Sequence, residues 1–232
     1  MKLLSRLWHS LRARLRPSTH QDTIPDTPPR VRQPKPRRVL LDKEAIRALP
    51  DFAGLPLDAI AVVQSAAEVA EACAVLRRDG LLGFDTESKP TFQKGEHAQG
   101  PHLVQLSTAT RAYLFPLGDK VPAPLAELLA APEVRKIGFD LRSDLALLAG
   151  NHGVHCHGVE DLVGRFRRLG YTQTVGAVQA VALLFKQHYR KSKSVKMSNW
   201  AAPELNVGQR RYAANDAYVA LRVYLALQAS KH

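Results

Sequence analysis

The sequence predicts an α/β protein in which a mixed β-sheet is covered by helices on both faces. From about residue 55 onward, short apolar segments typical of strands alternate with segments of helical periodicity. The segment 81–87 (LLGFDTE) has the apolar density of a central strand that is buried on both faces. The segments 102–107 and 112–117 are joined by a short turn, so we expect them to pair antiparallel and the sheet to be mixed.

The other elements follow from capping residues and periodicity. The apolar segment 59–63 is expected to form a first strand. Ser65 and Glu68 form a capping-box pattern before an amphipathic helix at 66–78, and Gly80 ends it. Further along the chain we expect a strand at 134–138 and helices at 123–131, 141–148, 159–169, 175–185 and 209–229.

Length and composition set the class of protein. The chain has 232 residues, of which 45% are apolar and 23% are charged, and this suits one sizeable globular domain plus a tail. No apolar run is long enough for a membrane-spanning helix, so we expect no stable membrane insertion. The two cysteines, Cys73 and Cys156, lie in no CxxC motif or Cys/His cluster. This argues against a disulfide scaffold and against a structural zinc site.

We predict two parts, a basic, proline-rich tail and linker at 1–54 and a folded domain at 55–232. Residues 1–41 hold ten of the 33 Lys and Arg residues but two of the 21 Asp and Glu residues, so most of the formal net charge of +12 lies there. Residues 17–41 contain six of the fifteen prolines, which indicates an extended linker. The charge favours a polyanionic partner such as nucleic acid, although a purely solubilising tail has the same composition.

The first sixteen residues, MKLLSRLWHSLRARLR, form an acid-free amphipathic pattern with arginines on one face. They lack the continuous apolar run of a secretory signal. Three interpretations remain open: an organelle transit peptide, a membrane-surface helix or a nucleic-acid-binding arm. We expect a cytoplasmic protein of bacterial type, with organelle targeting by this helix as the alternative.

Two acidic residues lie on the predicted central strand. Asp85 and Glu87 are two positions apart, so both side chains project from one face, near the carboxyl end where open α/β sheets place their sites. Two buried carboxylates on one face repel each other unless a cation lies between them, and oxygen ligands favour Mg²⁺ or Mn²⁺. The alternative is a strand end that emerges into solvent.

Two further acidic motifs follow along the chain. Tyr212 and Asp216 are one turn apart on the last predicted helix and share a face. Asp140 is placed to cap the helix that begins near residue 141, and Asp144 lies in its first turn. Each motif alone has a structural alternative: an amphipathic helix with an exposed aspartate, or an acid that favours the positive end of the helix dipole.

Taken in order, these motifs resemble the DEDD superfamily of 3′–5′ exonucleases, which has a ribonuclease-H-like fold and includes ribonuclease D and the Werner-type exonuclease domain. The matching stretches are GFDTESKP with Asp85 and Glu87, KIGFDLRSDLALL with Asp144, and YAANDA with Tyr212 and Asp216. The resemblance covers about residues 55–228. The tyrosine of the third motif is typical of the DEDDy branch. One departure is Asp140, which stands where proofreading relatives often carry asparagine.

The resemblance implies a ribonuclease-H-like mixed sheet and a site for two divalent ions, Mg²⁺ or Mn²⁺. It implies that the four acids are catalytic residues and metal ligands: Asp85 bridges both ions, Glu87 and Asp216 complete the nucleophile-side site, and Asp144 acts on the other ion. Tyr212 orients the attacking water. The expected reaction is hydrolysis from the 3′ end to nucleoside 5′-monophosphates, with DNA favoured because the third motif is similar to that of Werner-type domains.

A basic stretch at 186–196 carries five Lys and Arg residues and Tyr189, a composition that suits a channel for single strands but also an ordinary solvated loop. We expect a nucleic-acid substrate with a free 3′ end, single-stranded or recessed. We assign its binding to Lys191, Lys193, Lys196 and Trp200. The alternative functions are an RNA-trimming exoribonuclease similar to ribonuclease D, and a non-catalytic nucleic-acid-binding module, against which the presence of all four acids argues.

Overall fold

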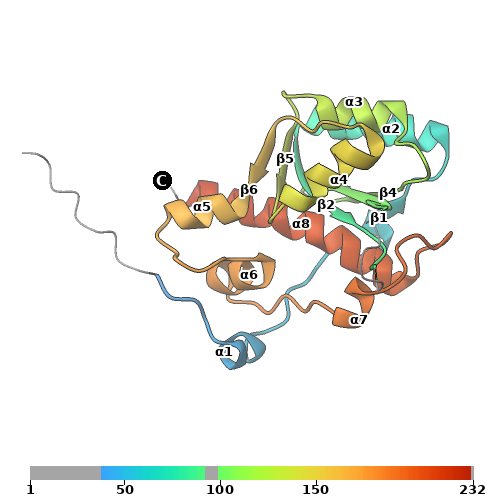
Figure 1. Ribbon diagram of the computed structural model, residues 1–232. Coiled ribbons are helices and arrows are strands. Elements are labelled where there is room, and N and C mark those ends of the chain that lie inside the picture. Colours follow the sequence, from blue (N-terminus) through green and yellow to red (C-terminus); the bar gives the residue numbers. More distant parts are fainter. Residues whose placement is uncertain (1–37, 92–98, 231–232) are drawn as a thin grey trace, which may run out of the picture. The chain divides into compact units, whose positions relative to one another are not determined.

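The computed structural model describes residues 38–91 and 99–230 (Figure 1). The predicted N-terminal amphipathic helix and nearly all of the proline-rich linker lie outside these ranges. The described residues all belong to one unit of the chain. In the described ranges no helix is both long enough and apolar enough to cross a membrane.

A six-stranded mixed sheet runs through this unit. Its strands are β1 (Ile60–Val62), β2 (Leu81–Glu87), β3 (Leu103–Ser107), β4 (Ala112–Pro116), β5 (Arg135–Gly138) and β6 (Val159–Asp161). They lie side by side in the order β1-β4-β3-β2-β5-β6. β2 pairs antiparallel with β3 and parallel with β5, which confirms the predicted mixed sheet with residues 81–87 at its centre.

The edge strand β6 was not predicted from the sequence. Residues 159–169 were expected to form one helix, but residues 159–161 pair in parallel with β5. The helix starts only at Leu162, because the side chain of Asp161 accepts a hydrogen bond from the backbone N–H of Val163 and caps it. Three residues are too few to show the alternation by which a strand is recognised in a sequence.

Helices cover both faces of the sheet (Figure 1). They are α1 (Lys43–Arg47), η1 (Leu57–Ala59, a 3₁₀ turn), α2 (Ala66–Asp79), α3 (Ala123–Ala130), α4 (Arg142–His152), α5 (Leu162–Arg168), α6 (Ala177–Phe185), α7 (Lys193–Lys196) and α8 (Val207–Ala229). The helices α2, α3 and α4 pack on one face, while α8 lies across β2, β3, β4 and β5 on the other. The helix α6 packs against the outer side of α8.

The strand β2 distributes its side chains between these two layers. Leu82 and Phe84 are fully buried in the apolar core with α2 and α3. The alternate positions 83, 85 and 87 face α8. The strand therefore delivers its two acidic side chains to the α8 side, at its carboxyl end.

The residues just before β1 pack against the domain, which differs from the expected boundary at residue 54. We call residues 38–55 the N-terminal strap. Ile46 is 5% exposed, and Gln179 of α6 donates a hydrogen bond to the carbonyl oxygen of Leu41. Phe52 packs among the aromatic rings of Phe185, Tyr189 and Tyr218. The packing of these few apolar residues could not be predicted from the sequence, because they follow a basic, proline-rich stretch that is typical of a linker.

Candidate active site

A cavity of about 450 Å³ opens at the carboxyl end of β2. It lies where the end of β2, the start of α4, the segment around α7 and the middle of α8 come together. The five side chains that the sequence singled out for catalysis all line it, together with two of the predicted substrate-binding lysines: Asp85, Glu87, Asp144, Tyr212, Asp216, Lys191 and Lys196. Motifs that are more than 120 residues apart in the sequence thus share one cavity.

The contact between β2 and α8 brings the first and third motifs together. Gly83 has no side chain, and the carbonyl oxygen of Ala217 lies where its Cβ would be. This close packing places Asp85, two residues along β2, beside Asp216, the residue before Ala217. Tyr212 lies one turn earlier on α8, and it is 8% exposed.

Asp144 reaches the cavity from the opposite helical layer. It lies in the first turn of α4, and its carboxylate accepts a hydrogen bond from the hydroxyl of Thr86. Thr86 points to the α4 side of β2, whereas its neighbours Asp85 and Glu87 point to the α8 side. The end of β2 therefore contacts acidic residues from both layers.

Asp140 does not cap α4, which corrects the sequence-based expectation. The N-cap residue is Leu141, and Asp140 adopts a left-handed backbone conformation with φ of 54°. The carboxylate of Asp161 instead accepts hydrogen bonds from the backbone N–H groups of Asp140 and Leu141, at 3.1 Å each. Asp161 lies at the end of β6, so its role depended on a strand that the sequence did not predict. Asp140 is exposed at the cavity margin.

Burial and mutual repulsion make the acidic cluster costly to ionise. Burial raises the pKa of Asp85 well above its usual range, and the nearby charges of Asp216, Asp144 and Glu87 raise it further. Burial, followed by repulsion from Asp216, raises the pKa of Glu87 to about 8. The pKa of Asp144 is also raised by burial, against the opposing hydrogen bond from Thr86. A cluster of this kind binds cations because they relieve both costs.

Lys191 already provides one positive charge to the cluster. Its Nζ lies 2.6 Å from Oδ2 of Asp216 and 4.9 Å from the centroid of the Tyr212 ring. Burial opposes the charged form, but the Asp216 carboxylate more than compensates and raises the pKa of Lys191. The predicted substrate-binding lysine therefore contacts an acidic residue of the cavity in this arrangement.

Tyr189 has a different position from the one expected. The sequence left both a single-strand channel and an ordinary solvated loop open for its segment, but Tyr189 is 6% exposed and lies in the apolar core beside α6 and α8. Its hydroxyl donates a 2.7 Å hydrogen bond to Oδ1 of Asp216. A buried ring cannot stack on a nucleotide base, and it is not part of a solvated surface either, so neither interpretation of the segment describes Tyr189. The hydrogen bond between Tyr189 and Asp216 could not be predicted from the sequence, because no regular spacing relates the two residues.

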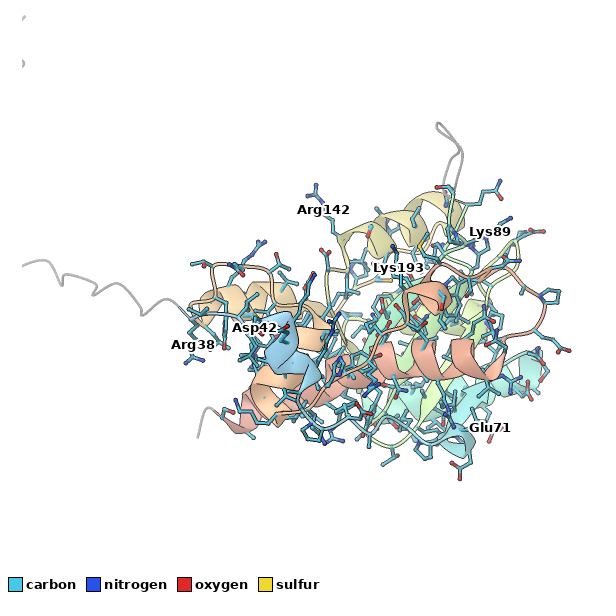
Figure 2. All side chains as sticks on the ribbon, turned by 90° about the horizontal axis from the view of Figure 1, so that it is seen from below. Arg38, Asp42, Glu71, Lys89, Arg142 and Lys193 are labelled. Carbon is cyan, nitrogen blue, oxygen red and sulfur yellow. The ribbon has the colours of Figure 1, made fainter. Side chains whose placement is uncertain are left out.

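Trp200 also differs from its expected role in substrate binding. It is 2% exposed, its indole N–H donates to the carbonyl oxygen of Lys196 at 3.1 Å, and its ring packs against Tyr212 at 5.9 Å between centroids. These contacts make Trp200 a packing partner of Tyr212 and leave no face for a base. Lys193, labelled in Figure 2, lies on α7 and is exposed, but it does not line the cavity.

The donor atoms suit hard divalent cations. In the parts of the chain that the structure describes, no three His, Cys, Asp or Glu side chains are arranged to hold a metal ion. At Asp216 the cation is the ammonium group of Lys191. The set of donors nevertheless fits Mg²⁺ or Mn²⁺ by its chemistry, because it consists of carboxylate oxygens with raised pKa values on a cavity open to solvent.

A cluster of carboxylates with a tyrosine, at the end of the central strand of such a mixed sheet, defines the class of ribonuclease-H-like nucleases. Residues 60–230 match the sequence model of the family described as 3′–5′ exonuclease. The chain belongs to this family. This confirms the family that the motifs suggested and the expected fold class.

Known proteins agree with this assignment. The chain is 26% identical over 150 residues to the mouse bifunctional 3′–5′ exonuclease/ATP-dependent helicase WRN, with 63% of this chain and 11% of that protein covered. It is 27% identical over 165 residues to a 3′–5′ exonuclease of Drosophila melanogaster, with 63% and 44% covered. The matches thus span less than half the length of these two relatives.

Solved structures show the same fold. The EXO domain of Aedes aegypti Nibbler superposes with a TM-score of 0.65 at 23% identity, over 77% of this chain and 92% of that one. Escherichia coli RNase D superposes with a TM-score of 0.62 at 21% identity, over 74% and 46%. These likenesses concern the fold of the domain.

Proposed function

We propose that this chain is a metal-dependent 3′–5′ exonuclease that hydrolyses nucleic acid, with DNA favoured, and releases nucleoside 5′-monophosphates. One observation carries the proposal. Asp85, Glu87, Asp144, Tyr212 and Asp216 come from three distant motifs and line one cavity, in a chain of the 3′–5′ exonuclease family. A binding module would not need four costly buried or half-buried acids beside a tyrosine.

Each residue takes a role that follows from its position. Two divalent ions, when bound, would supply charge for activating water and for stabilising the leaving 3′-oxygen. We assign their binding to Asp85, Glu87, Asp144 and Asp216. Tyr212 lines the cavity from α8, and we assign to its hydroxyl the orientation of the attacking water by a hydrogen bond. The water attacks the phosphorus of the last phosphodiester, the bond from that phosphorus to the 3′-oxygen of the preceding nucleotide breaks, and that oxygen leaves as a hydroxyl by taking up the proton that the water loses.

We assign the lysines to binding the phosphates of the substrate, and not to activating the water. Lys196 lines the cavity, and Lys191 would be available for a phosphate if divalent ions took the place of its ammonium group at Asp216. Lys193 is exposed on α7 and suits a contact with the strand further from its 3′ end. The substrate is therefore a strand with a free 3′ end, single-stranded or recessed, whose backbone follows the segment around α7.

RNA is the alternative substrate. One structural neighbour is Trypanosoma brucei RNase D in complex with RNA U12, with a TM-score of 0.62 at 21% identity over 79% of this chain and 64% of that one. DNA stays the first choice because the third motif, with SNW before YAANDA, is similar to that of Werner-type domains. Contacts to the 2′-hydroxyl separate the two substrates.

The test is digestion of 5′-labelled substrates by the full chain. Single-stranded DNA, duplex DNA with a recessed 3′ end and RNA of one sequence are compared in Mg²⁺, in Mn²⁺ and in chelator. We expect a ladder that shortens from the 3′ end, 5′-monophosphate products, and no reaction in chelator. Asp85→Asn should abolish the reaction while the circular dichroism spectrum is unchanged. Near wild-type turnover by Asp85→Asn would overturn the site assignment, and a ladder from the 5′ end would overturn the function.

A further inference from the structure

We propose that Tyr189 is a positioning residue for Asp216, and that the N-terminal strap holds Tyr189 in place. This inference deepens the proposed function, since it rests on the same site. It assigns a function in the active site to the strap and to the segment before α7. Neither of these two parts of the chain contains a family motif.

The first step of the argument is the contact between the two side chains. Tyr189 is 6% exposed and Asp216 is 4% exposed, so solvent has little access to either. The Tyr189 hydroxyl donates to Oδ1 of Asp216 at 2.7 Å, while Oδ2 lies 2.6 Å from the Lys191 ammonium group. With Oδ1 held by a buried donor, the carboxylate cannot rotate freely. Its second oxygen, Oδ2, is thereby directed at the Lys191 ammonium group.

Such an arrangement is typical of groups that orient a ligand. Partners that hydrogen-bond to a metal-binding carboxylate fix its direction, and their loss commonly costs 10–100-fold in metal affinity or activity. Tyr189 has the required features, because it is a neutral donor, it is buried, and it contacts the oxygen away from the Lys191 ammonium group. A tyrosine that only filled the core would not need its hydroxyl on a carboxylate, and Phe would serve as well there.

The second step is the packing of the strap on Tyr189. The ring of Phe52 meets the ring of Tyr189 edge to face, with centroids 5.9 Å apart and planes at 75°. The backbones of the two segments are bonded to each other: the N–H of His188 donates to the carbonyl oxygen of Pro50 at 2.8 Å, and the N–H of Phe52 donates to that of His188 at 3.0 Å. The strap thus fixes both the ring of Tyr189 and the backbone next to it.

The strap also contacts the residue that precedes Asp216 on α8. The backbone N–H of Leu55 donates to Oδ1 of Asn215 at 2.8 Å. Gly54 packs so closely that a Cβ there would lie 2.3 Å from the same Asn215 oxygen. Residues 50–55 of the strap therefore contact both Asn215, which precedes Asp216 on α8, and the segment of Tyr189, whose hydroxyl bonds to Asp216.

The experiment compares two Tyr→Phe variants of the full chain. Tyr189→Phe removes the hydroxyl and keeps the ring against Phe52. The control is Tyr224→Phe, which removes a hydroxyl that Gln228 contacts further along α8, away from the cavity. Binding of Mn²⁺ alone is measured by calorimetry without substrate, and kcat and KM are measured on a labelled oligonucleotide.

We expect Tyr189→Phe to weaken Mn²⁺ binding at least tenfold and to lower kcat at least tenfold, with KM for the oligonucleotide within twofold of wild type. Tyr224→Phe should match wild type in all three. Equal Mn²⁺ affinity and kcat for Tyr189→Phe and wild type, or no binding of Mn²⁺ by wild type, would overturn the positioning role. If Tyr189→Phe weakens Mn²⁺ binding but wild type degrades no nucleic acid, the positioning role stands and the proposed function fails.

A third variant tests the strap. Phe52→Leu keeps the Tyr189 hydroxyl and loosens the packing around its ring. We expect a smaller loss of Mn²⁺ affinity in the same direction, about two- to fivefold, alongside lower stability in urea. If Phe52→Leu lowers stability and leaves Mn²⁺ affinity unchanged, the strap supports the fold only, and its part in the proposal is overturned.

Discussion

Gly83 of β2 lies directly against Ala217 of α8. A Cβ at position 83 would be 1.9 Å from the carbonyl oxygen of Ala217 and 2.6 Å from the hydroxyl of Ser107. No residue with a side chain fits at that point. Because Asp85 and Asp216 are close neighbours of these two residues in sequence, the closeness of strand and helix also sets the closeness of the two carboxylates.

Gly83→Ala should therefore damage both stability and activity. We expect the free energy of unfolding to fall by about 1–3 kcal/mol, the usual cost of overpacking. We expect turnover to fall about 100-fold, since a displacement of about 1 Å at a catalytic group has that effect. Gly150→Ala is the matched control, because a Cβ there meets nothing within 4 Å inside α4 and should stabilise the helix by about 1 kcal/mol. Wild-type turnover in folded Gly83→Ala would contradict this account.

The second motif contains two aspartates whose roles should separate. Asp144→Ala should abolish turnover, because this carboxylate lines the cavity and its partner Thr86 holds it there. Asp140→Asn should keep most of the turnover, because Asp140 is exposed and asparagine tolerates the left-handed conformation at φ of 54°. Both rates are measured under identical conditions in Mn²⁺. If Asp140→Asn instead abolished turnover and Asp144→Ala kept it, the catalytic acid of the second motif would be Asp140 and not Asp144.

Much of the site was predictable because its residues lie on regular elements. Residues 81–87 form the predicted strand, so the shared face of Asp85 and Glu87 follows from the two-residue period alone. Tyr212 and Asp216 follow in the same way from the helical period on α8. Which elements meet in space does not follow from either period. We predicted that these elements meet in one site from the order of the motifs, through the resemblance to a known family.

The remaining features depend on contacts between distant segments. The basic neighbours of Tyr189 left a single-strand channel and a solvated loop both open, yet its ring is buried against Phe52, which lies more than 130 residues earlier. Lys191 was predicted to bind the nucleic-acid substrate, and its ion pair with Asp216 could not be inferred from spacing. Trp200 was assigned to substrate binding, and its burial could not be foreseen because the sequence does not tell a buried aromatic from an exposed one.

Two truncations should separate the tail from the strap. A chain that begins at residue 38 keeps the strap and should remain folded with wild-type turnover. It lacks nine Lys and Arg residues, so its binding to nucleic acid should weaken and depend less steeply on salt. A chain that begins at residue 56 also loses Ile46 and Phe52 and should unfold at lower urea concentration with reduced turnover. Equal stability of the two chains would contradict the strap's packing role, and an unchanged salt slope would show that the tail does not bind the substrate.

The metal-free protein should lose stability as the pH rises, and Glu87 should account for part of the loss. Its pKa is 4.5 in an unperturbed chain and about 8 in the folded protein. Between these values the folded state binds the proton more tightly than the unfolded state, so the free energy of unfolding falls with rising pH. Glu87→Gln removes this proton. In chelator at pH 8 the variant should be more stable than wild type by about 1–3 kcal/mol, and at pH 4.5 the two should nearly agree.

Urea unfolding at several pH values in chelator measures this difference directly. The slope for Glu87→Gln should be flatter than for wild type but not zero, because burial also raises the pKa of Asp85 and of Asp144. Adding Mn²⁺ at pH 8 should stabilise wild type more than the variant, since binding to the folded state stabilises it by mass action and the variant has lost one carboxylate. Parallel stability curves for wild type and Glu87→Gln would show that Glu87 ionises freely and lies outside the acidic cluster.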